Sequence, residues 1–169
     1  PADSDAEGVL VASTCGGSWR TRYAALSALA RRGAATPEAI AALVAACADP
    51  DRTTRISALT FLAKAFPGGE LPAAKLREAA KDPAPSVRRY ALSLLRLWRT
   101  DHTRETLARA ATDPDARVRG EAAEGLALGW PEAEVTRDTL SWTLCAAIDW
   151  VRGVAESRRL PATGMMSWE

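Results

Sequence analysis

The feature that most constrains the fold of this chain is a sequence pattern that returns at a nearly constant interval. The dipeptide Asp-Pro occurs three times, and its copies are 33 and then 31 residues apart. Six residues after each of these aspartates comes an arginine, and three residues after each arginine comes an alanine. Arginine and alanine recur at the same interval on either side, which makes five copies. Self-similarity of this period is typical of stacked helical repeats.

The aligned positions form columns through the five copies. The alanines are Ala25, Ala58, Ala91, Ala122 and Ala155. Seven residues after each arginine the chain has Leu29, Leu62, Leu95 and Leu126, and Arg159 in the fifth copy. A further column upstream consists of Leu10, Leu43, Leu76, Leu107 and Leu140. Positions three and seven past the arginine share one face of an α-helix, so we expect both columns in the core.

Each repeat is predicted to contain two helices, here called helix A and helix B, as at residues 37–48 and 53–66. Asp-Pro ends helix A, because proline lacks an N–H and disfavours helical geometry in the residue before it. Gly33 and Pro67-Gly68-Gly69 separate successive repeats. One hairpin cannot bury its apolar face alone, so neighbours must stack. We therefore predict an all-α fold, a right-handed α–α superhelix (solenoid) of five helical hairpins.

The whole chain, residues 1–169, is expected to form a single repeat domain. The approximate repeats are residues 6–33, 36–66, 70–98, 103–129 and 132–160, followed by a C-terminal tail at 161–169. In the fifth repeat, Glu156 and Arg159 stand where earlier copies have leucine. A terminal repeat needs a polar outer face, so we interpret the fifth repeat as a cap.

The columns resemble HEAT repeats, especially the short bacterial form known from phycobilisome lyase subunits. The resemblance rests on Asp82-Pro83, Val87-Arg88, Ala91-Leu92 and Leu95, and on Asp113-Pro114, Val118-Arg119, Ala122 and Leu126. It covers about residues 6–160. The family includes scaffolds, chromophore lyases, a hydroxylase and DNA glycosylases, so the resemblance implies a fold rather than one function. It also implies a structural ladder between neighbouring repeats, built from Arg22, Asp49, Arg55, Asp82, Arg88, Asp113, Arg119 and Arg152.

The sequence carries little that points to catalysis. His102 is the only histidine, which excludes a His-rich metal site such as that of the hydroxylase branch. There is no glycine-rich phosphate loop, Cys-x-x-Cys pair or nucleophile elbow. We interpret Asp113 and Asp115 as a turn and an N-cap rather than a cation site, and Asp101-His102 as a solvated loop rather than a dyad. We predict no catalytic residues, no metal and no cofactor, and favour a non-enzyme.

Several features favour a cytoplasmic protein. The longest uncharged stretch, residues 8–19, has twelve residues and is too short to span a bilayer. The N-terminus has neither a positive region nor an apolar region typical of a secretory signal. Cys15, Cys47 and Cys145 are odd in number and far apart, so we expect buried free thiols in a reducing compartment rather than a disulfide. The oligomeric state is left open.

Charge distribution is the strongest functional indication. The helix B segments 18–33, 52–66 and 86–99 carry net charges of +4, +3 and +4, whereas segment 116–129 is neutral. In stacks of this type helix B lines the concave side, so we expect a shallow basic groove with small polar residues along its middle. The predicted binding residues are Arg20, Tyr23, Arg31, Lys64, Arg89, Arg96, Arg117 and Trp150.

Three functions remain open from the sequence. The leading hypothesis is a scaffold that binds a protein or an acidic peptide on its concave face. The second is nucleic-acid binding, with glycosylase-like chemistry as one form, although no matching Trp-plus-Asp motif is found. The third is a chromophore lyase with its pocket at the tryptophan-rich end. The six tryptophans are Trp19, Trp98, Trp130, Trp142, Trp150 and Trp168.

Overall fold

The computed structural model describes residues 2–33, 36–134, 136–139 and 141, and these residues contain helices and turns but no strand. The helices with complete bounds are α1 (Ala2–Ser13), α2 (Trp19–Arg31), α3 (Pro37–Ala46), α4 (Arg52–Ala65), α5 (Glu70–Ala79), α6 (Pro85–Leu95), α7 (Asp101–Ala110) and α8 (Ala116–Gly129). None of the helices in this part of the chain is long and apolar enough to cross a membrane.

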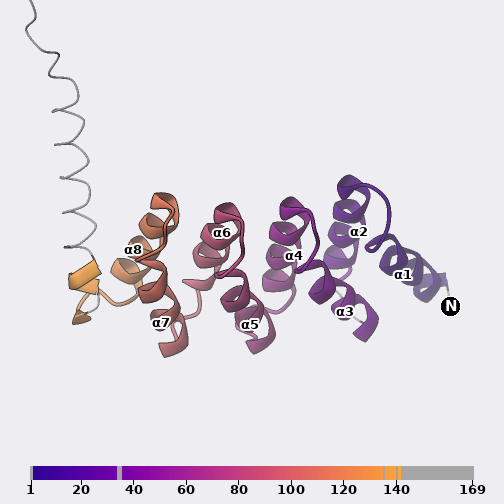
Figure 1. Ribbon diagram of the computed structural model, residues 1–169. Helices are drawn as coiled ribbons and strands as arrows, with labels where there is room; N and C mark the ends of the chain where they lie inside the picture. Colours follow the sequence, from indigo (N-terminus) through magenta and orange to yellow (C-terminus); the bar gives the residue numbers. More distant parts are fainter. Residues whose placement is uncertain (1, 34–35, 135, 140, 142–169) are drawn as a thin grey trace, which may run out of the picture.

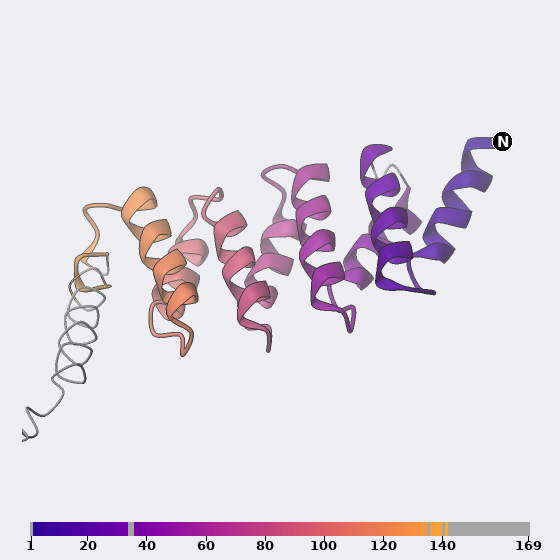
Figure 2. The ribbon, with the colours of Figure 1, turned by 90° about the horizontal axis from the view of Figure 1, so that it is seen from above.

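Consecutive helices form four hairpins that follow one another in sequence order (Figures 1 and 2). Helices α2, α4, α6 and α8 pack side by side and form one layer, here called the B layer. Helices α1, α3, α5 and α7 lie on the other side and form the A layer. The predicted all-α solenoid is therefore confirmed for these four hairpins. Most of the predicted fifth repeat, and all of the predicted tail, lie outside the described residues.

The helix starts follow from local chemistry. Thr36 caps α3 by accepting the Ala39 N–H at 3.2 Å, and Pro37 occupies the first helical position, where a missing N–H costs nothing. Ser18 and Thr100 cap α2 and α7 in the same way. Because Thr100 caps α7, His102 lies in the first turn of that helix and is exposed, whereas a loop had been predicted there.

The Asp-Pro turns repeat one geometry. Each Asp carboxylate accepts the N–H two residues later, at 2.8 Å for Asp49, 2.8 Å for Asp82 and 2.9 Å for Asp113. This Asx turn reverses the chain directly after helix A, and the intervening proline prevents the helix from continuing. After helix B, Gly33 and Gly68 have φ angles of 83° and 77°, which glycine adopts without strain.

The core consists of the predicted columns. Leu29, Leu62, Leu95 and Leu126 from the B layer, together with Leu43, Leu76 and Leu107 from the A layer, are all fully buried. The alanine column is buried as well, with exposed fractions of 3% or less at Ala25, Ala58, Ala91 and Ala122. Small side chains in this column let neighbouring helices approach closely. The core is thus a row of leucines between the layers, and it leaves the outer face of the B layer free for polar residues.

Candidate functional site

The repeated arginines and aspartates pair between successive repeats. In each pair, the Nε and Nη2 groups of an arginine on a B helix donate to the two carboxylate oxygens of the aspartate in the following Asp-Pro turn. The pairs are Arg22–Asp49 at 2.6 and 2.9 Å, Arg55–Asp82 at 2.7 and 2.8 Å, and Arg88–Asp113 at 2.8 and 2.7 Å. Such two-point hydrogen bonds fix both the distance and the angle between neighbours.

The third donor of each arginine binds its own repeat. Arg55 Nη1 donates to the Asp49 carbonyl at 2.8 Å, and Arg119 Nη1 donates to the Asp113 carbonyl at 2.9 Å. The hydrogen bond from Arg88 holds the pKa of the Asp113 carboxyl below its ordinary value. Because their hydrogen bonds are used in this way, Arg22, Arg55 and Arg88 are poor candidates for binding a partner. Arg152, the last predicted ladder residue, lies outside the described residues.

Six of the predicted binding residues are exposed on the B layer, and these are Arg20, Tyr23, Arg31, Lys64, Arg89 and Arg117. The Arg20 guanidinium lies over the Trp19 ring, 4.9 Å from its centroid. The Tyr23 ring packs against Phe61 of the next B helix, with centroids 5.8 Å apart. Trp19 and Tyr23 are 40% and 43% exposed, so an aromatic surface borders the cations of α2. Trp150 lies outside the described residues.

The small polar column is packed more tightly than the predicted groove requires. The residues predicted along the middle of the groove, which include Ser27, Thr60 and Ser93, are half-buried at these three positions. Thr60 Oγ1 lies 3.1 Å from the Tyr90 hydroxyl of α6, so this space holds contacts between helices. The contacts favour a broad surface over a groove along this column.

Arg96, another of the predicted binding residues, forms ion pairs with α8. Its Nη1 donates to Glu124 at 2.6 Å and lies 3.8 Å from Glu121, both on α8. Burial raises the pKa of Glu121, while Arg96 opposes that rise. Arg96 therefore ties α6 to α8, and its charge is compensated within the chain.

The two layers differ sharply in charge. Within their bounds, the four B helices carry ten lysines and arginines and two glutamates. The four A helices carry four lysines and arginines and eight carboxylates. Three of the ten B-layer cations are ladder arginines with aspartate partners, and seven remain. The outer face of the B layer is therefore basic, and Arg52 adds to it although it was not among the predicted residues.

Two hollows lie away from this face, on the side of the A layer. One of about 400 Å³ lies between α3 and α5 beside Cys47 and Lys75. Another of about 410 Å³ lies between α5 and α7, where Arg77, His102 and Arg109 share it with glutamates. No group of three or more metal-ligating side chains is found among the described residues. Asp115 caps α8 and Asp113 forms the preceding turn, which accounts for both carboxylates.

The cysteines differ in their surroundings. Cys15 is exposed at the end of the first helix, so the expectation of buried thiols is wrong for this residue. Cys47 is partly buried, and burial raises the pKa of its thiol to about 12.

We expect iodoacetamide at pH 8 to modify Cys15 and to leave Cys47 unmodified in the folded protein, because the thiolate is the reactive form. Peptide mass mapping of native and denatured samples measures this. Equal labelling of both thiols in the native sample would contradict it.

Comparison with known proteins supports the repeat assignment. The sequence model of the family described as HEAT repeats matches residues 73–157, which is half of the chain. No curated protein matches the chain. The matched segment begins in α5 and covers the Arg88–Asp113 step of the ladder.

Proposed function

The chain belongs to the HEAT repeat family, and from this premise we propose that it is a non-catalytic scaffold that binds an acidic protein segment on the outer face of its B layer. HEAT repeats generally mediate protein interactions, and their stacking gives an extended surface to which each repeat contributes one helix.

The observation that supports the proposal is the unequal charge of the two layers. Once the three ladder arginines paired with aspartate are set aside, the B helices carry seven cations against two glutamates beside an acidic A layer, which favours one face for a negatively charged partner. Such a face raises the association rate with anionic partners and excludes basic ones.

The aromatic residues next to the cations favour a protein over a nucleic acid. Trp19 and Tyr23 border Arg20 on α2, and arginine with tyrosine or tryptophan is the composition enriched in the energetic centres of protein interfaces. A phosphate backbone would be attracted by the same cations, so nucleic acid is the competing outcome. The lyase hypothesis depends on a pocket at the tryptophan-rich end, most of which lies outside the described residues, and the glycosylase hypothesis lacks a matching Trp-plus-Asp motif.

Neutralising the basic face should weaken binding of an acidic peptide about tenfold, since several surface charges each contribute a modest part of the attraction. The test variant carries Arg20→Gln, Lys64→Gln and Arg89→Gln, one change on each of three B helices. Glutamine is used because a carboxylate at a helix C-terminus would also destabilise the helix. Fluorescence anisotropy with a labelled glutamate-rich peptide measures the affinity.

The matched control carries Lys81→Gln, Arg104→Gln and Arg109→Gln, which remove three cations on the A-layer side. It should bind like the parent, and both variants should keep the parent's helical circular dichroism. Equal losses in the two variants would refute a site on the B layer. Tighter binding of an oligonucleotide, with an affinity that falls steeply with salt, would favour the nucleic-acid function instead.

A further inference from the structure

Near the C-terminal end of each B helix, one side chain lies six residues after the alanine of the alanine column, so the repeats have equivalent positions there. These four residues, here called the C-terminal edge, are Arg31, Lys64, Leu97 and Leu128. Arg31 and Lys64 are exposed, and Leu97 and Leu128 are 71% and 60% exposed. The edge is therefore basic over the first two repeats and apolar over the next two.

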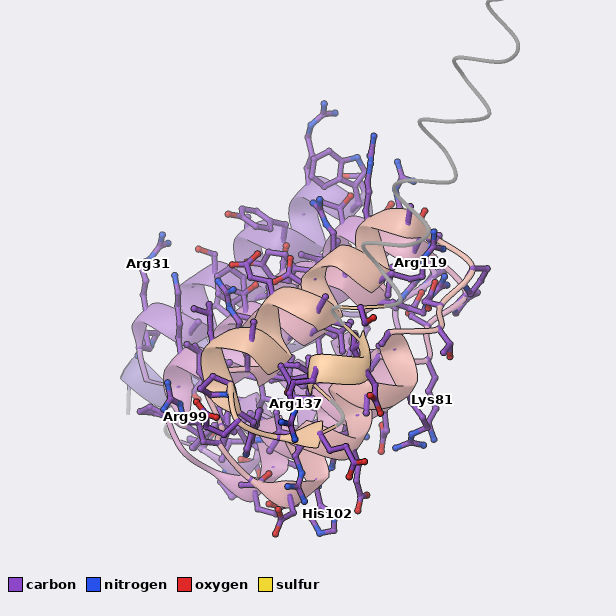
Figure 3. The ribbon with its side chains drawn as sticks, turned by 90° about the vertical axis from the view of Figure 1, so that its left-hand side faces the viewer. Arg31, Lys81, Arg99, His102, Arg119 and Arg137 are labelled. Atoms are coloured by element: carbon purple, nitrogen blue, oxygen red, sulfur yellow. The ribbon has the colours of Figure 1, made fainter. Side chains whose placement is uncertain are left out.

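The four positions lie on one side of the molecule. Figure 3 shows Arg31 and Arg99 on the side opposite the ladder residue Arg119. Arg99 Nη2 donates to the Leu128 carbonyl at 3.3 Å, which joins the chain just after α6 to the end of α8. Because α4 packs between α2 and α6, Lys64 stands between the ends of the outer two helices. The order along the edge is thus the order in the sequence.

Helix stability explains the two cations of the C-terminal edge but not its two leucines. A cation in the last turn of a helix interacts favourably with the helix dipole, which accounts for Arg31 and Lys64. The same effect gives no reason for leucine at the two equivalent positions. Leu97, two residues after the end of α6, and Leu128, in the last turn of α8, leave apolar surface in water, and grouped surface of that kind marks interaction sites.

The charge near the apolar half is also reduced. Arg96, one residue before Leu97, is paired with Glu124 of α8 at 2.6 Å. In the basic half, Arg31 donates to the neutral Ser27 hydroxyl, and Lys64 has no ion pair with any of the described residues. The two halves of the edge therefore differ in charge as well as in hydropathy.

We infer that the C-terminal edge binds an extended peptide whose acidic residues occupy one end and whose apolar residues occupy the other. This inference rests on the proposed function and specifies the sequence that the scaffold accepts. Neighbouring helices are about 10 Å apart, and an extended chain in the polyproline II conformation rises about 3.1 Å per residue with three residues per turn. Every third side chain of such a peptide therefore faces the same surface at about the spacing of the helices. The matching pattern is Glu-x-x-Glu-x-x-Leu-x-x-Leu, or the same order reversed, according to the direction in which the peptide runs.

The test compares peptides of identical composition. Two segregated peptides carry the Glu, Glu, Leu, Leu pattern in either direction, and an alternating peptide carries Glu, Leu, Glu, Leu at the same spacing, with serine and glycine between. One segregated peptide should bind about tenfold more tightly than the alternating one, because only it places both leucines on apolar surface. Equal affinity of all three peptides would overturn the inference.

Protein variants separate this inference from the proposed function. Leu97→Ser with Leu128→Ser should remove the advantage of the segregated peptide and keep the weaker binding of a glutamate–serine peptide. Leu71→Ser is the control, because Leu71 is 41% exposed on α5 in the A layer. If the glutamate–serine peptide binds through the B layer but the leucines add nothing, the inference fails and the proposed function stands. If no acidic peptide binds, both fail.

Discussion

Replacing Asp113 by alanine should lower the free energy of unfolding by about 3 kcal/mol, at the lower end of what breaking a buried ion pair costs. The change leaves the Arg88 guanidinium, whose side chain is only 12% exposed, without its carboxylate partner. It also removes the acceptor of the Asp115 N–H that forms the turn before α8. Urea unfolding followed by circular dichroism measures the difference.

The loss of stability caused by Asp113→Ala should depend on pH, and it should be smaller in acid. Because Arg88 lowers the pKa of Asp113 below its ordinary value of 3.8, the ionised carboxylate stabilises the folded state. That contribution is complete above the unfolded-state pKa and is lost as the pH falls through the lower folded-state pKa. The difference between the parent and Asp113→Ala should therefore be constant above about pH 5 and shrink below about pH 4.

Two further variants separate charge from turn geometry. Asp113→Asn keeps an oxygen for the Asp115 N–H but loses the charge. Its free energy of unfolding should therefore fall between those of the parent and of Asp113→Ala. Glu78→Ala breaks the exposed Lys75–Glu78 pair, whose glutamate is 67% exposed, and should cost less than about 0.5 kcal/mol. If Asp113→Ala is no more harmful than Glu78→Ala, the ladder does not stabilise this stack.

The sequence predicted the features that depend on the repeat period. The leucine and alanine columns, the Asp-Pro turns and the Arg–Asp spacing all depend on residues within one or two repeats, so aligning the copies is enough to find them. The buried states of Leu62 and Ala91 follow from their helical spacing alone.

Features that depend on a contact between two particular residues of different repeats could not be predicted in this way. The pairing of Arg96, a predicted binding residue, could not be read from the sequence, because Glu124 lies 28 residues later and faces Arg96 only once α6 and α8 stack. Leu97 and Leu128 were missed for the opposite reason, since leucine in a helix is usually counted with the core. Both leucines lie six residues after the alanine of the alanine column, which places them off the buried face. Their exposure could have been predicted by extending the column that begins with Arg31 and Lys64.

The largest expected change in stability comes from Leu107 at the interface between the two layers. Leu107 is fully buried on α7 among Leu92, Val118 and Leu126. Leu107→Ala should lower the free energy of unfolding by about 3–4 kcal/mol, through lost burial and the cavity that remains. Thermal and urea unfolding measure this loss. A loss below about 1 kcal/mol would show that this interface relaxes around the missing side chain.

Leu107 also determines what Gly125 of α8 tolerates. A Cβ atom at Gly125 would lie 3.0 and 3.1 Å from the two methyl carbons of Leu107. Alanine gains about 1 kcal/mol over glycine inside a helix, and this contact should cancel most of that gain in the parent. In the Leu107→Ala background the methyl carbons are gone, so Gly125→Ala should restore about 1.5–2 kcal/mol by helix propensity and by filling part of the cavity.

Gly120→Ala on the exposed face of the same helix provides the control for this coupling. A Cβ atom at Gly120 meets nothing within 4 Å, so alanine should add about 1 kcal/mol of stability in both backgrounds. The double-mutant cycle between positions 107 and 125 should then give a coupling energy above about 1 kcal/mol, and the cycle with position 120 a value near zero. Equal changes in stability on Gly125→Ala in the two backgrounds would contradict this prediction, because they would show that the Leu107 side chain does not oppose a side chain at position 125.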